Sequence, residues 1–142
     1  MPNRFGPRGV IALMIPLQNG NMQPEYEAMR PEGVSNQIYR FSLAQPDDVA
    51  EAVIGALPGA RGCYPDLIVC GNSLEMRHWS VERQALYRAE VQDAVPEVPV
   101  ITATDAVETA LRTIGAKKIA VLSPMSEVYS KSVASYYSGL GF

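Results

Sequence analysis

The sequence predicts an α/β fold in which helices cover both faces of a parallel, doubly wound, flavodoxin-like sheet. Short apolar runs alternate with segments whose apolar residues recur at helical spacing, which is the pattern of βαβ units. The run from Val10 to Ile15 is apolar at every position, as expected for a strand buried on both faces. With 142 residues, 47% of them hydrophobic, the chain is long and apolar enough for one domain with its own core.

Five strands are expected, because each apolar run is short and is bounded by Gly, Pro, Asn or Ser. They cover residues 10–15, 34–41, 66–70, 98–101 and 118–122. Doubly wound sheets of this size commonly take the strand order 2-1-3-4-5. In that order the loops after the first and third strands, residues 18–21 and 71–73, flank one crevice at the carboxyl edge of the sheet.

Five helices are expected between and after these strands, at residues 24–29, 47–57, 80–94, 104–115 and 126–137. Ser80 and Thr104 are the expected N-caps, since a hydroxyl there accepts a hydrogen bond from the first turn. Pro58 with Gly59 is expected to end the second helix, and Gly115 is expected to cap the fourth at its C-terminus.

Uncharged polar residues gather at the predicted crevice. Asn19, Asn72 and Ser73 lie in its two loops, and Thr104 and Ser123 follow the fourth and fifth strands. Convergent N–H and O–H groups suit a carboxylate, or an enolate that develops during a reaction. The alternative is that these residues only end strands and cap helices. The first loop has no glycine-rich phosphate motif, so phosphate or flavin binding is a weak rival.

Cys70 ends the third predicted strand beside Gly71. A thiol near helix N-termini can be held as a thiolate and act as a base or nucleophile. The residues alone slightly favour the alternative, a small buried apolar side chain. Cys63 is expected to be inert, and His78 has no acidic or hydroxyl partner at a recognisable motif spacing.

Composition excludes several partners. The net charge of −3 argues against nucleic acid, which requires a basic surface. No apolar segment approaches the length of a membrane span, so no membrane partner is expected. Two cysteines are too few for a disulfide framework and favour a reducing, cytoplasmic compartment. One histidine argues against a structural zinc site.

The first strand and its loop have the spacing P-x-x-N-x-x-M-x-P-E, which resembles maleate cis-trans isomerases. These enzymes and the arylmalonate decarboxylases form one branch of the aspartate/glutamate racemase superfamily. Residues 66–74 resemble the family strand that leads to the first active-site cysteine, and residues 98–124 resemble its V-P-x-x-T strand and following helix. The resemblance covers what would be the N-terminal half of a family member.

This resemblance implies an enzyme without a cofactor that isomerises, decarboxylates or racemises a small carboxylate or dicarboxylate through an enolate-type intermediate. It makes Cys70 the only plausible catalytic thiol in this half of the molecule. The residues that it implies around the substrate are Pro16, Asn19, Gly71, Asn72, Ser73, Thr104 and Ser123.

The sequence also departs from the family. Aligned without a gap, Gly71 rather than Cys70 takes the position of the family cysteine, as it does in arylmalonate decarboxylases. Met125 stands where the family has a tyrosine, and no second cysteine follows in a later segment. The alternative function is therefore a carboxylate-binding or regulatory module that has kept the crevice and lost the chemistry.

Two units are expected along the chain. Residues 1–115 form a first lobe with the crevice loops, and residues 116–142 form a strand and a helix. This second unit either completes the same sheet or is the start of a second lobe that projects toward a partner. Its apolar residues need a surface to cover them, so we expect a second copy to bury them in a homodimer.

Overall fold

The structure is a computed structural model that describes residues 4–43, 49–73, 78–123 and 125–142. Its centre is a parallel sheet of four strands with the order β2-β1-β3-β4. The strands are β1 (Gly9–Pro16), β2 (Val34–Phe41), β3 (Leu67–Cys70) and β4 (Val100–Thr102). This confirms the predicted α/β class, the parallel pairing and the order of the first four strands. The described residues contain no helix long and apolar enough to cross a membrane.

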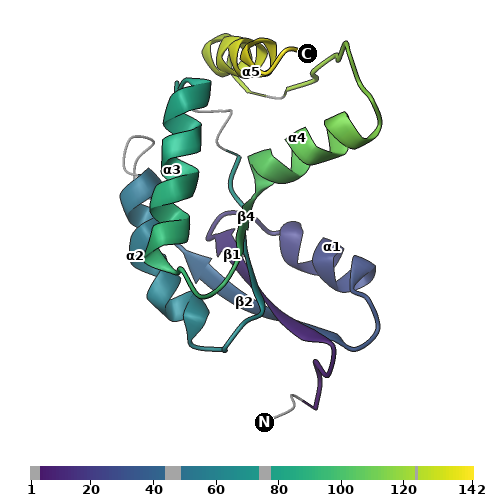
Figure 1. The fold of residues 1–142 in the computed structure, drawn as a ribbon, viewed down its shortest axis with the longest axis vertical. Helices are drawn as coiled ribbons and strands as arrows, with labels where there is room; N and C mark the ends of the chain where they lie inside the picture. The colour runs from purple at the N-terminus through teal and green to yellow at the C-terminus, as the bar shows by residue number, and fades with distance from the viewer. Residues whose placement is uncertain (1–3, 44–48, 74–77, 124) are drawn as a thin grey trace.

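The described residues contain five helices at positions close to those predicted, one after each strand and a fifth after the fourth helix. They are α1 (Met22–Met29), α2 (Val49–Arg61), α3 (Val81–Ala94), α4 (Ala103–Thr113) and α5 (Glu127–Gly139). Figure 1 shows α2 and α3 together on one face of the sheet, α1 on the other face, and α5 beyond the carboxyl edge. The predicted start of α2 at residues 47–48 lies outside the described residues.

The larger part of the core lies between the sheet and the pair α2 and α3. Five residues there are at most 1% exposed: Met14 and Ile68 from the sheet, Leu57 from α2, and Tyr87 and Val91 from α3. The opposite face has a smaller cluster, built on Leu13, Ile15 and Val69 with partly buried residues of α1. Strand β1 is buried on both faces, as its uninterrupted apolar run predicts.

Two predicted helix ends are wrong. Helix α2 continues through Pro58 to Arg61, because Leu57 and Ala60 are buried in the core and their packing outweighs the cost of a proline on the exposed side. Helix α4 is capped by Thr102, not Thr104: the Thr102 hydroxyl accepts from the Asp105 amide at 3.2 Å, and the Asp105 carboxylate accepts from the Thr102 amide at 3.2 Å. Gly115 follows α4 with a φ of +70°, as expected of a C-terminal glycine.

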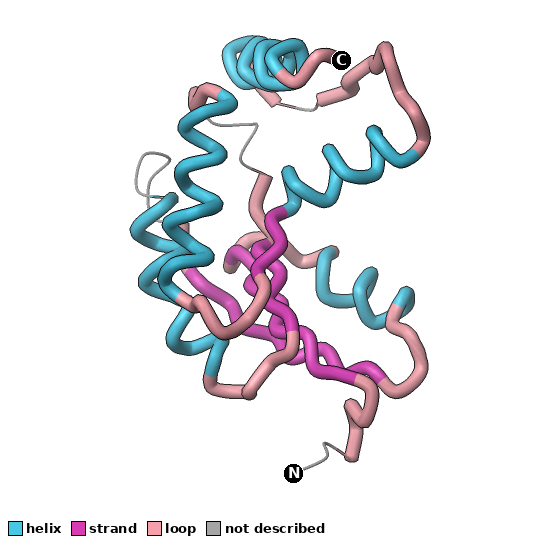
Figure 2. The backbone as a smooth tube through the Cα atoms, viewed as in Figure 1, coloured by secondary structure: helices cyan, strands magenta, loops and turns pink. Residues whose placement is uncertain are grey.

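The predicted fifth strand is also wrong. Residues 118–122 form no strand, and the described sheet ends at β4. Helix α4 leads the chain away from β4, so the segment returns between α4 and α5, far from a strand that it could pair with (Figure 2). Its side chains instead help to build a third cluster, in which Val133, Tyr136 and Tyr137 of α5 pack with Leu111 and Ile119.

Candidate functional site

The loops after β1 and β3 are neighbours at the carboxyl edge of the sheet. Met14 pairs with Cys70 in the parallel register, and the Gly71 amide donates to the Met14 carbonyl at 2.9 Å. Pro16 is the last residue of β1. The switch point predicted from strand order therefore forms, and it brings the loop at 18–21 beside the loop at 71–73.

Gly71 is the point where the two loops touch. A Cβ atom built on Gly71 would lie 2.2 Å from the Met22 sulfur and 3.0 Å from the Met14 carbonyl oxygen. A larger residue at position 71 would require the Met22 side chain to turn away and the Met14 carbonyl to move by a few tenths of an ångström. The position that the family resemblance gives to a cysteine is thus filled here by the methionine that begins α1.

Asn19 organises its own loop. Its side-chain oxygen accepts from the Asn21 amide at 3.0 Å and from the Met22 amide at 2.9 Å, and so satisfies the first turn of α1. Arg40 of β2 donates to the Asn19 carbonyl at 2.9 Å. Asn19 lines a shallow hollow of about 550 Å³ together with Pro16 and Glu25. The Glu25 carboxylate makes this hollow a poor place for an anion.

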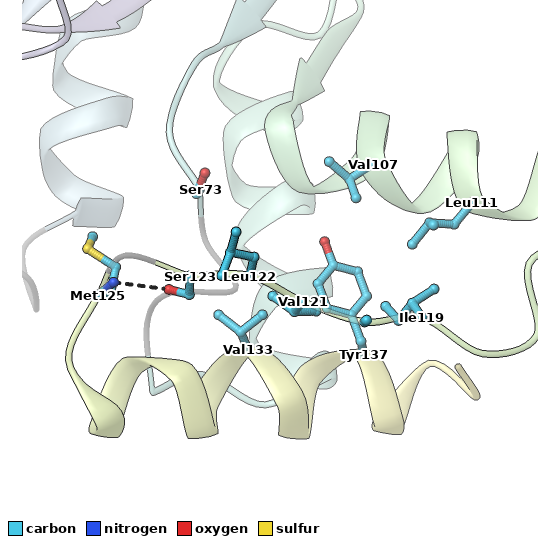
Figure 3. A pocket seen from close by; sticks show the side chains of 11 residues that line it. Ser73, Val107, Leu111, Ile119, Val121, Leu122, Ser123, Met125, Val133 and Tyr137 are labelled. Atoms are coloured by element: carbon cyan, nitrogen blue, oxygen red, sulfur yellow. Dashed lines mark hydrogen bonds between the residues drawn. The ribbon is translucent and has the colours of Figure 1, made fainter.

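Ser73 lines a different and mostly apolar pocket of about 500 Å³. Helix α4, the segment after it, and α5 form the walls, and none of the described residues that line the pocket is charged. Figure 3 shows Ser73 and Ser123 toward one end and Leu111 and Ile119 toward the other. The lining residues are Ser73, Val107, Leu111, Ile119, Ala120, Val121, Leu122, Ser123, Met125, Val133 and Tyr137.

Ser123 holds the turn that leads into α5. Its hydroxyl oxygen accepts from the Met125 amide at 3.2 Å (Figure 3). The pocket therefore has two serine hydroxyls at the end nearest the N-terminus of α5, where the helix dipole favours negative charge. This end of the pocket is the best place for a carboxylate that the described residues offer.

Two other predicted donors point elsewhere. Asn72 is only 5% exposed, and its side chain approaches Tyr87 of α3 closely enough to lower the pKa of that hydroxyl, although burial as a whole raises it. Thr104 is fully buried in the first turn of α4. The structure thus brings Ser73 and Ser123 into one pocket, and places Asn19, Asn72 and Thr104 outside its lining.

Cys70 is fully buried in the core between β1 and α3. Its sulfur lies 3.9 Å from the Met14 sulfur. Burial, with a smaller contribution from the Asp105 carboxylate, raises the pKa of the thiol from 9.0 to about 12. A thiol of this pKa is protonated at neutral pH, whereas a catalytic base or nucleophile needs the thiolate. The surroundings of Cys70 favour a packing role, and its catalytic role stays a prediction.

One pair of interacting side chains could not be predicted from the spacing of residues in the sequence. His78 has a hydroxyl partner, because its Nδ1 lies 2.9 Å from the Ser132 oxygen, and its ring stacks on Tyr129 with centroids 5.6 Å apart. These contacts fasten α5 to the residues before α3. Ser132 is 54 positions away in the sequence, so only the fold reveals the pairing.

The same fold occurs in solved structures of two kinds of enzyme. A maleate cis-trans isomerase from Nocardia farcinica matches with a TM-score of 0.72 at 18% identity, over 94% of this chain and 60% of the isomerase chain. An arylmalonate decarboxylase matches with a TM-score of 0.77 at 14% identity, over 94% and 57%. A maleate isomerase from Pseudomonas putida gives 0.69 at 19% identity, over 94% and 60%.

These neighbours belong to the branch that the sequence resembles, so the resemblance is confirmed at the level of the fold. The chain spans no more than 60% of the length of each of these structures, which is consistent with an N-terminal half. No protein-family model matches the sequence, and a search of curated proteins gave no match.

Proposed function

We propose that this chain, which shares the fold of maleate isomerase and arylmalonate decarboxylase, is part of an isomerase, decarboxylase or racemase that uses no cofactor. Its substrate is a small carboxylate or dicarboxylate, and the reaction passes through an enolate-type intermediate. The observation that supports this most is the pocket at the carboxyl edge of the sheet, where Ser73 and Ser123 present two hydroxyls beside an apolar wall.

The pocket suits an anion whose charge moves during a reaction. Neutral O–H and N–H donors stabilise a carboxylate and an enolate oxygen alike, and in apolar surroundings each such hydrogen bond is stronger than in water. The Ser73 hydroxyl and the Ser123 hydroxyl bind the carboxylate, while the side chains of α4 and residues 119–122 cover the remainder of the substrate. The substrate-binding roles predicted for Pro16, Asn19 and Gly71 stay predictions, because none of these residues lines this pocket.

The same proposal includes a second copy of the chain. Ile114, Val121, Leu122 and Val128 are more than half exposed around the pocket, and apolar patches of this kind usually mark an interface. A homodimer that covers this side excludes water from the pocket and so strengthens the hydrogen bonds to the substrate. Sedimentation at micromolar concentration is expected to show a dimer, and a clean monomer would remove this part of the proposal.

A carboxylate-binding or regulatory module is the second candidate, and the burial of Cys70 favours it. With its pKa raised to about 12, the thiol offers no ready base or nucleophile at neutral pH. The described residues then supply binding groups without an activated thiol. Both candidates share the pocket and differ only in whether a bound carboxylate is converted.

Activity measurements separate the two. The purified chain is incubated with malonates, maleate and amino acids, with and without a reagent that blocks thiols. Turnover that the reagent abolishes supports the enzyme and a catalytic thiol. Carboxylate binding without turnover supports the binding module.

Binding measurements test the pocket itself. Replacing Ser73 with Ala is expected to weaken carboxylate binding by about 1–3 kcal/mol, the cost of leaving a charged partner without its hydrogen bond. The matched control is Ser135→Ala, because Ser135 is an exposed serine of α5 outside the pocket lining. Equal affinities for the two variants would mean that Ser73 is no ligand.

A further inference from the structure

Three side chains behind the Gly71–Ser73 loop have buried polar atoms without a hydrogen-bond partner in the described part of the chain. They are the amide of Asn72, the amide of Gln84 and the hydroxyl of Tyr87, and each side chain is at least 95% buried. An unsatisfied buried polar group costs about 1–3 kcal/mol, so such groups are rarely kept in a core without a role. Gln84 and Tyr87 lie one turn apart on α3, and Asn72 is the second residue after the end of β3.

The Tyr87 hydroxyl is held in a fixed place. The tyrosine ring is fully buried in the main core, and the Trp79 ring packs on it with centroids 5.4 Å apart. Tyr87 packs in the same cluster as Cys70, and the buried Asn72, two positions further along the extended chain, lies on the same side of the sheet. A packed aromatic ring gives its polar group little freedom to turn away.

The direction of the Asn72 side chain has a consequence for its neighbours. Asn72 stands between Gly71, which touches Met22, and Ser73, which lines the pocket. Its side chain is buried toward α3, whereas Ser73 is exposed. Met22 therefore limits the space at Gly71, while Asn72 is directed into the core and Ser73 toward the pocket.

We propose that Asn72 is a positioning residue, and that its amide, linked to the Tyr87 hydroxyl through an internal water, sets the backbone of Gly71–Ser73 so that the Ser73 hydroxyl faces a carboxylate in the pocket. This rests on the proposed function for the carboxylate, and it moves Asn72 from the substrate to the scaffold behind it. Gln84 has no part in this link.

The test is a double-mutant cycle with Tyr87→Phe and Asn72→Ala, read by malonate titration and by the backbone amide signals of Gly71 and Ser73 in NMR spectra. Tyr87→Phe keeps the ring and removes only a buried hydroxyl, so the core is preserved. It is expected to shift both amide signals and to weaken malonate binding about three- to tenfold. The double variant is expected to bind no more weakly than Asn72→Ala alone, because the two changes break one link.

Gln84→Leu is the matched control, since it removes another unpaired buried polar group from the same helix and is expected to leave the signals and the affinity unchanged. Additive losses in the cycle, or a Tyr87→Phe variant with unshifted amide signals, would overturn the proposal. If the unaltered chain binds no malonate, the proposed function fails, and the amide signals still decide whether Tyr87 positions the loop.

Discussion

Two regions of the molecule contain similar apolar residues but bury them to different extents. The first is the sheet with helices α2 and α3, and the second runs from α4 to the last residue. In the first region Leu13, Met14 and Ile15 are fully buried. In the second, Ile114 is 76% exposed and Leu122 is 99% exposed. The difference is not in the side chains, since both regions contain Ile, Leu and Val at regular spacing. It lies in whether another element of the same chain is there to cover them.

Strand formation shows the same contrast. Strand β3 has only four residues but has β1 on one side and β4 on the other, so its backbone groups are paired. Residues 119–122 are also uninterrupted apolar residues, and no described strand lies beside them. A segment therefore forms a strand only when a second segment lies beside it to pair with, and an apolar run by itself shows only that a strand is possible.

Truncating one leucine in each region gives the largest expected difference. Leu13→Ala leaves a cavity in the centre of β1 and is expected to lower the free energy of unfolding by about 2–5 kcal/mol. Leu122→Ala removes an exposed side chain and is expected to change it by less than about 0.5 kcal/mol. Urea denaturation of both variants measures this. A large loss with Leu122→Ala would show that residues 118–122 are covered in solution.

The stability of the core should fall in alkali because of Cys70. Its pKa is about 12 in the folded chain against an ordinary 9.0, so between these values only the unfolded chain ionises. The stabilisation is complete below pH 9 and is lost above it at about 1.4 kcal/mol per pH unit. Tyr87, whose pKa is also raised, adds to the loss above pH 10.

Urea denaturation from pH 8 to pH 10 checks this dependence. Cys70→Ala is expected to flatten the profile, and Cys63→Ala is expected to change it less, because Cys63 is only partly buried. A profile of Cys70→Ala that falls as steeply as that of the unaltered chain would show that Cys70 is accessible to water in the native state.

Removing a helix cap is expected to have the smallest effect on stability, and the caps of α4 and α5 can be compared directly. Thr102 forms a complete capping box with Asp105, so Thr102→Ala is expected to destabilise the chain by about 0.5–2 kcal/mol. Ser126 begins α5 without a side-chain cap bond, and Ser126→Ala is expected to cost a few tenths of a kcal/mol at most. Thermal unfolding of the two variants measures the difference. Equal losses would mean that the Ser126 hydroxyl caps α5 in solution.

Sequence reasoning worked where short-range chemistry decides the outcome. The strand at 34–41 and the cap at Ser80 were predicted residue for residue, since alternation and capping act within a few positions. The adjacency of the loops after the first and third strands followed from strand order, a rule that needs no side-chain detail. The end of α2 was missed because burial of Ala60 is a long-range effect.

The directions of the side chains at the candidate site could not be predicted from the sequence. The loops at residues 18–21 and 71–73 were placed correctly, but the direction of each side chain depends on partners far along the chain. Asn19 accepts hydrogen bonds from the Asn21 and Met22 amides at the start of α1, and Asn72 is buried in the core. The polar residue Gln84 stands on the buried face of α3 with Tyr87 and Val91, a spacing that could have flagged polar groups behind the crevice.

The contact between Met22 and Gly71 has a consequence for which residues position 71 can accept. A thiol introduced at position 71 would meet the Met22 sulfur and the Met14 carbonyl oxygen at once. The Met22 side chain therefore has to turn away or become smaller, and the Met14 carbonyl has to move by a few tenths of an ångström, before a cysteine at 71 fits. Position 22 is thus coupled to position 71, and the start of α1 helps to decide which side chains the loop after β3 can have.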